Sequence, residues 1–313
     1  MSKAVKAILV ICAIAVAAGL VIGGVGVISG GMRAVSFEWD NGLKVVTPGS
    51  LTAQEFSKPL AQADNLNVTA EACKLNFVEG DSFMVSGQYD PDYWDLSVDT
   101  QGTTLNIGLK MTKDFFGMFS LPLLSNAAGA STELTVTVPR DTTFKSLTIN
   151  GSAIDADIGS LSADSLTLSV SANSFTADKL TCSDLDLESS AGSVTIGQLD
   201  ATSSAVISLS AGKLDITQGS LTGLAFKLSM GTFNFNGTLS GRNTISASAG
   251  TANLNLQQSS QDIAFSSNVS AGSFTVNNRD VSGFINSGST GSNSNATSLS
   301  AKVSAGTVNV TTQ

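Results

Sequence analysis

Two aspartate pairs, Asp155/Asp157 and Asp184/Asp186, carry the side chains best suited to acid–base chemistry in this sequence. An inverting glycosidase needs two carboxyl groups about 6.5–9.5 Å apart, and one of them needs a pKa raised by burial. Both pairs have the i, i+2 spacing of one strand face, and Leu185 must point to the opposite, inward face. No cluster of Arg or Lys lies beside them. The pattern therefore favours a solvated surface over a catalytic centre.

The segment 90–95, with the sequence DPDYWD, places three carboxylates within six residues. Calcium needs six to eight oxygen ligands, and an EF-hand loop adds a central glycine and a terminal glutamate that this segment lacks. Asp-Pro-Asp is typical of a turn, so we expect a bend here with Tyr93 and Trp94 packed on a sheet. We therefore predict no metal site and no cofactor.

The chain contains no histidine and three cysteines. The absence of histidine excludes Ser-His-Asp and Cys-His catalysis and every His-ligated metal site. No CxxC pair is present, which excludes zinc ribbons and thioredoxin-like motifs. Cys73 and Cys182 are separated by more than a hundred residues, and nothing in the sequence brings their Cα atoms within about 7 Å. We predict buried free thiols, with a disulfide formed outside the cell as the alternative.

Residues 7–32 form an uncharged segment of 26 residues. As a helix this segment would reach about 39 Å, which exceeds the hydrocarbon core of about 30 Å. The apolar region of a cleaved secretory signal is only about 7–15 residues long. We therefore predict a signal anchor over residues 1–32, with a cleaved signal as the alternative. Lys3 and Lys6 precede the helix and keep that end cytoplasmic, so a single-pass topology with the rest of the chain extracytoplasmic is expected.

The C-terminal half repeats every 19–20 residues. Each copy contains a corner of small residues, often Ser-Ala-Gly, whose third position falls at 154, 173, 192, 212, 231, 250, 272 and 306. Apolar residues alternate before and after each corner, which is strand periodicity. Two short strands and their turns in about 20 residues make one coil of a β-solenoid. We predict an all-β, parallel β-solenoid over residues 148–313, a single-stranded β-helix of right-handed winding, with Gly or Asn at positive φ in the corners.

The stretch 33–147 contains alternating segments at irregular intervals, which we interpret as hairpins that cap the first coil and protect its edge. Residues 115–124, FFGMFSLPLL, form its most apolar run. This run either folds over the open end of the solenoid, which we favour, or contacts the bilayer or a partner. Residues 286–297 are low in complexity and predict a surface loop.

Small polar residues occupy the outward positions that follow each corner. Stacked coils would assemble them into a flat face of hydroxyl and amide groups. Such residues suit an exposed parallel ladder for structural reasons alone, and the alternative is a surface for a glycan or another polymer. The positions are Ser174/Thr176, Ser193/Thr195, Thr232/Asn234, Thr251/Asn253, Ser273/Thr275 and Thr307/Asn309.

The formal net charge of −9 and the pI near 4.4 make nucleic acid and anionic lipid headgroups poor partners. The predicted anchor, the strand LTVTVP at 134–139 and the ladder LDLESSAGSVTI at 185–196 together resemble the bacterial putative-adhesin family of β-strand-repeat proteins, a Gram-positive type of domain of unknown function. The resemblance covers roughly residues 60–313. It implies adhesion or envelope integrity and supplies no catalytic motif.

We accordingly predict a non-enzymatic, membrane-anchored cell-surface protein without catalytic, cofactor-binding or metal-binding residues. Its expected partner is a surface protein or a glycan of unknown identity. The alternatives are an accessory protein in envelope-stress signalling and, less favoured, an exported polysaccharide-active enzyme built on the same type of scaffold.

Overall fold

The structure is a computed structural model that describes residues 34–38, 42–46, 53–112, 132–171, 173–281 and 297–313. The predicted anchor at 1–32, the apolar run at 115–124 and residues 286–296 of the predicted loop lie outside these ranges. A search of the described residues finds no helix with the length and apolar character needed to cross a membrane. Strands β1 (Ala34–Glu38) and β2 (Gly42–Val46) form an antiparallel pair in a unit of their own.

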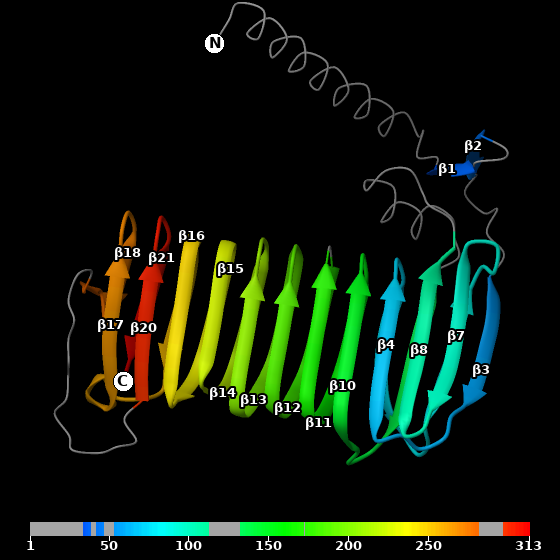
Figure 1. The fold of residues 1–313 in the computed structure, drawn as a ribbon, viewed down its shortest axis with the longest axis horizontal. Helices are drawn as coiled ribbons and strands as arrows, with labels where there is room; N and C mark the ends of the chain where they lie inside the picture. Colours follow the sequence, from blue (N-terminus) through cyan, green and yellow to red (C-terminus); the bar gives the residue numbers. More distant parts are fainter. Residues whose placement is uncertain (1–33, 39–41, 47–52, 113–131, 172, 282–296) are drawn as a thin grey trace, which may run out of the picture. The chain divides into compact units, whose positions relative to one another are not determined.

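All other described strands belong to one sheet of 19 strands, drawn in Figure 1. These strands are β3 (Gln54–Pro59), β4 (Asn65–Glu71), β5 (Lys74–Gly80), β6 (Met84–Tyr89), β7 (Trp94–Gln101), β8 (Thr104–Met111), β9 (Glu133–Pro139), β10 (Thr143–Ser152), β11 (Asp155–Ser171), β12 (Asn173–Ser189), β13 (Gly192–Leu209), β14 (Lys213–Thr222), β15 (Leu224–Ser240), β16 (Arg242–Leu256), β17 (Ile263–Val269), β18 (Ser273–Val276), β19 (Arg279–Asp280), β20 (Thr297–Val303) and β21 (Thr307–Thr312), with a 3₁₀ turn at Ser260–Asp262.

Stacked coils pair in parallel over three stretches rather than two. Strand β11 pairs with β12 over residues 155–158, 160–163 and 165–170, and the later coils repeat these stretches. We call them the first, second and third ladders. The chain bends between them at Gly159 and Asp164 without leaving the sheet. The predicted parallel β-solenoid is therefore confirmed as an all-β, largely parallel stack, its coil has one more straight segment than expected, and its handedness stays a prediction.

The core is made by the inward side chains of the three ladders. In the first ladder, one column of paired residues contains both large and small apolar side chains, and every member is at most 2% exposed. A mixture of side-chain sizes lets neighbouring layers interdigitate in a narrow interior. Phe226 and Phe233 stack across this interior with ring centroids 4.1 Å apart. The column runs through Ala156, Phe175, Val194, Leu214, Phe233, Ala252, Val308 and Phe274.

Glycine is required at the corners mainly because stacked backbones approach closely there. Gly192, Gly212 and Gly231 have φ of 111°, 113° and 110°, as predicted, whereas the corner glycines Gly250, Gly272 and Gly306 do not have a positive φ. Even so, a Cβ on Gly250 would lie 2.7 Å from the carbonyl oxygen of Gly231 in the neighbouring coil. A Cβ on Gly212 would overlap the carbonyl oxygen of Gly192 in the same way. Contact between glycines of successive coils therefore explains the corner in both conformations.

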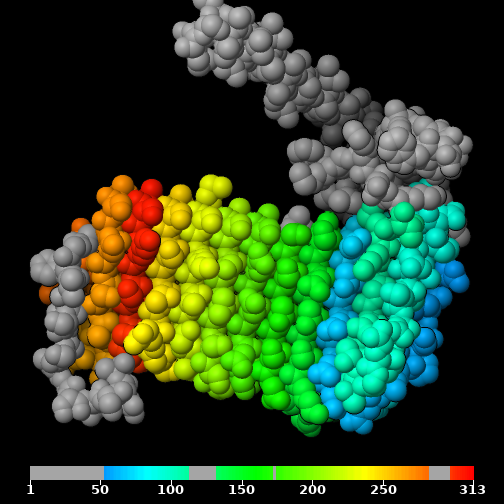
Figure 2. Space-filling view, viewed as in Figure 1, coloured from blue at the N-terminus to red at the C-terminus, as the bar shows by residue number. Residues whose placement is uncertain are grey.

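The last two coils are stacked in the reverse of their chain order. Strands β20 and β21 pair in parallel with β16 on one side and with β17 and β18 on the other. Figures 1 and 2 show this exchange as a red coil between the yellow and orange coils. The coils therefore do not follow their order in the sequence where the segments that contain Gly272 and Gly306 are stacked.

The opening stretch contains fewer hairpins than expected. Strands β4 and β8 extend the third ladder in parallel beyond β10, and β5 and β9 extend the first ladder beyond β11. Antiparallel pairs form only at the outer end of this part of the sheet, where β7 pairs with β8, β6 with β9, and β3 with β6. The parallel part of the stack thus begins about 80 residues before the predicted start at residue 148.

Candidate binding face

The polar residues that follow each corner lie on the outer side of the first ladder, as predicted. Thr232 pairs with Thr251, and Asn234 pairs with Asn253 in the next coil. Asn253 in turn pairs with Asn309, and that residue pairs with Thr275. All of these side chains are half-buried, because neighbours in the adjacent coils cover part of each one.

The amides on this ladder form a single directed chain of hydrogen bonds. The Thr275 hydroxyl donates to Asn309 Oδ1 at 2.9 Å, and Asn309 Nδ2 donates to Asn253 Oδ1 at 2.9 Å. Asn253 Nδ2 donates to Asn234 Oδ1 at 2.9 Å, and Asn234 Nδ2 donates to Asp215 Oδ1 at 2.6 Å. Every donor points the same way along the stack, so the chain ends at a carboxylate that can only accept.

The carboxylate at this end is also paired with a lysine. Lys213 Nζ lies 2.5 Å from Asp215 Oδ2. The amide of Asn234 and the ammonium of Lys213 therefore occupy different oxygens of Asp215. Asn309 can join the chain only because its coil is inserted between those of Asn253 and Thr275.

A hollow of about 560 Å³ lies over these amides on the outer side of the first ladder. Its floor includes Ile216, Phe235 and Leu254, each 2% exposed. Its remaining lining is polar and contains one ionised residue. These lining residues are Thr195, Asp215, Thr217, Asn234, Asn236, Asn253, Asn255, Asn309 and Thr311.

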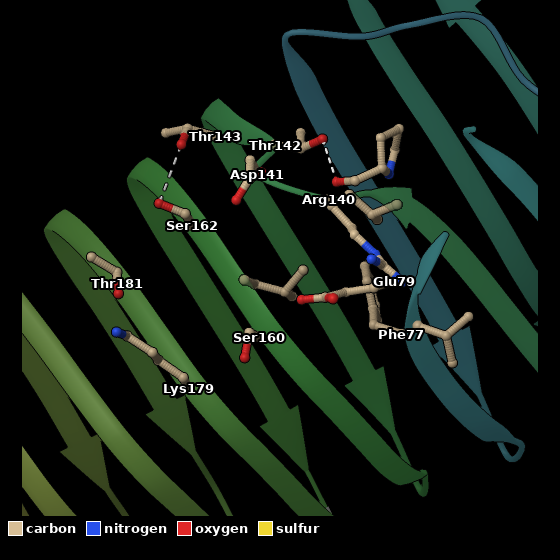
Figure 3. A pocket seen from close by; sticks show the side chains of 14 residues that line it. Phe77, Glu79, Arg140, Asp141, Thr142, Thr143, Ser160, Ser162, Lys179 and Thr181 are labelled. Atoms are coloured by element: carbon tan, nitrogen blue, oxygen red, sulfur yellow. Dashed lines mark hydrogen bonds between the residues drawn. The ribbon is translucent and has the colours of Figure 1, made fainter. Parts of the chain in front are cut away.

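A second groove, of about 340 Å³, lies where β5 and β9 diverge from the second ladder (Figure 3). Phe77 and Leu161 are buried in its floor, and exposed ionic side chains stand around its mouth. Figure 3 shows Arg140 beside Glu79, with Lys179 on the opposite side next to Thr181. Among the described residues, neither cation lies within ion-pair distance of a carboxylate. The groove therefore presents both positive and negative side chains that, among the described residues, do not form ion pairs with one another.

The two aspartate pairs lie on different ladders. Asp155 and Asp157 are exposed on the first ladder, whereas Asp184 and Asp186 are exposed on the third. Asp184 Oδ1 accepts a hydrogen bond from the Ser204 hydroxyl at 2.7 Å. Each pair faces solvent, as predicted, and neither pair meets a second carboxylate in a buried site.

The segment 90–95 folds as a turn. Asp90 is 6% exposed, its Oδ1 accepts from the backbone N–H of Asp92 at 2.9 Å, and its carbonyl accepts from Tyr93 and Trp94. Trp94 Nε1 donates to the Glu71 carbonyl at 3.1 Å. Tyr93 and Trp94 are both buried, as predicted, so the segment anchors β7 to the sheet.

Both described cysteines are buried and unpaired, as predicted. Burial raises the pKa of the Cys73 thiol to about 12 and that of the Cys182 thiol to about 12 as well. A protonated thiol is a poor nucleophile and a poor metal ligand. Within the described ranges, no group of three or more His, Cys, Asp or Glu side chains could hold a metal ion.

The hydrogen-bonded amide chain and the mixed-charge groove were not predicted. Asn234, Asn253 and Asn309 occupy the same position of three repeats, so aligning the repeats by that position would have indicated the chain. The groove had no such signal, because Glu79 and Lys179 are a hundred residues apart in the sequence and meet only through strand pairing.

A family model described as "Toastrack DUF4097" matches residues 63–311. No curated protein matches the chain. Several solved structures are similar. A putative cell adhesion protein from Clostridium sporogenes ATCC 15579 is 14% identical, with 84% of this chain and 100% of that one covered and a TM-score of 0.26. A putative adhesin from Bacteroides fragilis NCTC 9343 is 9% identical, with 86% and 100% covered and a TM-score of 0.41. A putative adhesin from Parabacteroides merdae ATCC 43184 is 11% identical, with 85% and 98% covered and a TM-score of 0.33.

Proposed function

The chain belongs to the toastrack DUF4097 family, and from this premise we propose that it is a non-enzymatic, adhesin-like interaction module on the cell surface. The observation that carries the proposal is the outer side of the first ladder. Successive coils there present half-buried hydroxyl and amide groups in register, fixed by hydrogen bonds to one another. Groups fixed in this way lose little side-chain entropy when they bind a partner.

The absence of a catalytic arrangement among the described residues supports a binding role. The aspartate pairs are exposed and separate, and the described cysteines are protonated at neutral pH. Catalytic acids and bases usually combine burial with a specific charge partner. The mixed-charge groove of Figure 3 is the feature that best suits the alternative, an exported polysaccharide-active enzyme, but its ionic groups stand apart at an open mouth.

We further propose that the module lies outside the cytoplasmic membrane and that residues 1–32 anchor it there. This part rests on the sequence: the uncharged segment 7–32 is long enough to span, and Lys3 and Lys6 precede it. The acidic balance of the chain disfavours direct binding to an anionic bilayer, so the anchor rather than the solenoid holds the protein at the membrane.

The test measures how many cells are retained on immobilised cell-wall glycan and on immobilised surface protein. It compares cells that express the full chain with cells that lack it. We expect retention on one of these coatings to depend on the chain and to disappear after protease is added to intact, wall-stripped cells. Retention that is the same with and without the chain would contradict the binding role. A full-length band that survives external protease but is lost on lysis would contradict the extracytoplasmic location.

A further inference from the structure

The hollow over the first ladder has unused hydrogen-bonding capacity. An asparagine amide carries two N–H donors, and its oxygen accepts two hydrogen bonds. In the chain described above, Asn234 and Asn253 each use one donor and one acceptor. Each therefore retains one N–H and one acceptor position. Because the side chains are half-buried and held in place, these remaining groups are presented to the hollow in a fixed orientation.

These groups repeat along the stack. Neighbouring coils of a parallel ladder are about 4.8 Å apart, so the amide donors and acceptors recur at that interval. A second row beside the first contains Asn236 and Asn255, joined by a hydrogen bond of 3.3 Å. A ligand that uses the whole hollow must therefore be extended along the stack and must repeat its own polar groups.

Charge and backbone pairing restrict the ligand further. The one ionised residue lining the hollow is Asp215, already paired with Lys213, and the chain carries a net charge of −9, so a polyanion is disfavoured. The backbone groups of the first ladder are already paired between coils, so a peptide cannot add here as a strand. A neutral polymer recognised through side chains fits both restrictions.

We propose that this hollow binds the chain of an N-acetylated glycan, laid along the stack. The inference rests on the proposed function and deepens it by naming the site and the ligand class. An acetamido group offers one N–H and one carbonyl, which complement the one acceptor and one donor that each asparagine retains. With no exposed aromatic side chain lining the hollow, each sugar binds weakly, and affinity accumulates over several coils.

The experiment measures binding of N-acetylglucosamine oligomers to the purified full-length chain in detergent by isothermal titration. We expect the hexamer to bind at least about tenfold more tightly than the dimer, because it contacts more coils. The glucose hexamer with the same linkage lacks the acetamido groups and is expected to bind at least about tenfold more weakly than the N-acetylated hexamer.

Two variants and one control locate the site. Asn255→Trp places a bulky side chain on an exposed strand position at the hollow and should weaken hexamer binding by at least about tenfold. Asn253→Ala interrupts the amide chain and should have a similar effect. The control is Asn106→Ala, which removes a comparable asparagine pair, Asn67 Nδ2 to Asn106 Oδ1 at 2.8 Å, on the third ladder. It should leave binding unchanged.

Equal hexamer binding by Asn255→Trp and the unsubstituted chain would overturn the assignment of the hollow as the binding site. Equal binding of the glucose and N-acetylglucosamine hexamers would overturn the acetamido complementarity. No hexamer binding, together with cell retention that still depends on the chain, would overturn this inference while leaving the proposed function intact. Loss of cell retention as well would overturn both. The melting temperature of each variant shows whether a loss of binding reflects the site or the fold.

Discussion

Asn243 offers the sharpest test of how the inserted coil is held. Its side chain is fully buried at the start of β16 and bonds to three coils. Oδ1 accepts from the backbone N–H of Leu224 at 2.9 Å, and Nδ2 donates to the carbonyls of Gly241 at 3.1 Å and Ser298 at 3.0 Å. Asn243→Leu keeps the branching and the number of heavy atoms of the side chain and removes all three bonds.

The expected loss follows from the groups left without partners. Leu224 is fully buried, so water cannot replace the bond to its N–H, and the carbonyl of Ser298 lies at the seam of the inserted coil. Each buried backbone group without a partner costs about 1–3 kcal/mol. The carbonyl of Gly241 keeps another partner, because it also accepts from the backbone N–H of Ser298 at 2.9 Å. For the two groups that lose their partners, we therefore expect Asn243→Leu to lower the free energy of unfolding by about 2–6 kcal/mol.

Urea denaturation followed by circular dichroism measures this change, and hydrogen exchange locates it. The control is Asn150→Leu, at an exposed position of β10, which should change stability by at most about 0.5 kcal/mol. Exchange should accelerate first at the amides of β20 and β21, because a stack of repeats depends on contacts between neighbours. Equal urea midpoints for the two variants would refute the argument that Asn243 fixes the inserted coil.

Three further predictions concern the corners, the thiols and the anchor. Gly212→Ala should lower the melting temperature strongly, because Gly212 has a φ of 113° and a Cβ there would overlap a neighbouring backbone. Gly159→Ala is the control and should be tolerated, because the nearest atom to its Cβ would be 3.6 Å away. Equal shifts in melting temperature for the two variants would contradict the role of close backbone approach at the corners. Because burial raises the pKa of both Cys73 and Cys182 from 9.0 to about 12, stability from the protonated thiols is complete below pH 9 and is lost as the pH rises toward 12. Urea midpoints measured across this range should fall less steeply in the Cys73→Ala/Cys182→Ala double variant, and parallel curves would show that the thiols do not contribute. Deleting residues 1–32 should release the chain from the membrane fraction after fractionation, and persistent membrane association would place the anchor elsewhere.

Local patterns predicted the coils well because each signal lies within one repeat. The alternation around positions such as Phe233 and Phe235 reports which side chains point inward, and both are buried. The same alternation placed Asn234 outward on a ladder, where it lies. The third straight segment of each coil was missed because the bends at Gly159 and Asp164 have no consistent turn residues in the other repeats.

The order of coils could not be predicted because the repeats are too alike. The segments 251–254, 273–276 and 307–310 share one pattern of outward polar and inward apolar residues. Any two of them can pair in the same register, so local sequence does not decide which are neighbours. The choice rests on contacts between distant residues, such as the bond from Asn243 to Ser298.

The reversed order of the last two coils has a consequence for synthesis. Residues 263–276 leave the ribosome before residues 297–312, yet the later coil separates them from β16. At about 5–20 residues per second, the 36 residues from Val276 to Thr312 take about 2–7 s to emerge. During that time the edge of β16 either stays open or pairs with a coil that must later leave it. We expect this interval to be the moment at which a nascent chain is most exposed to pairing with the equivalent coil of another nascent chain.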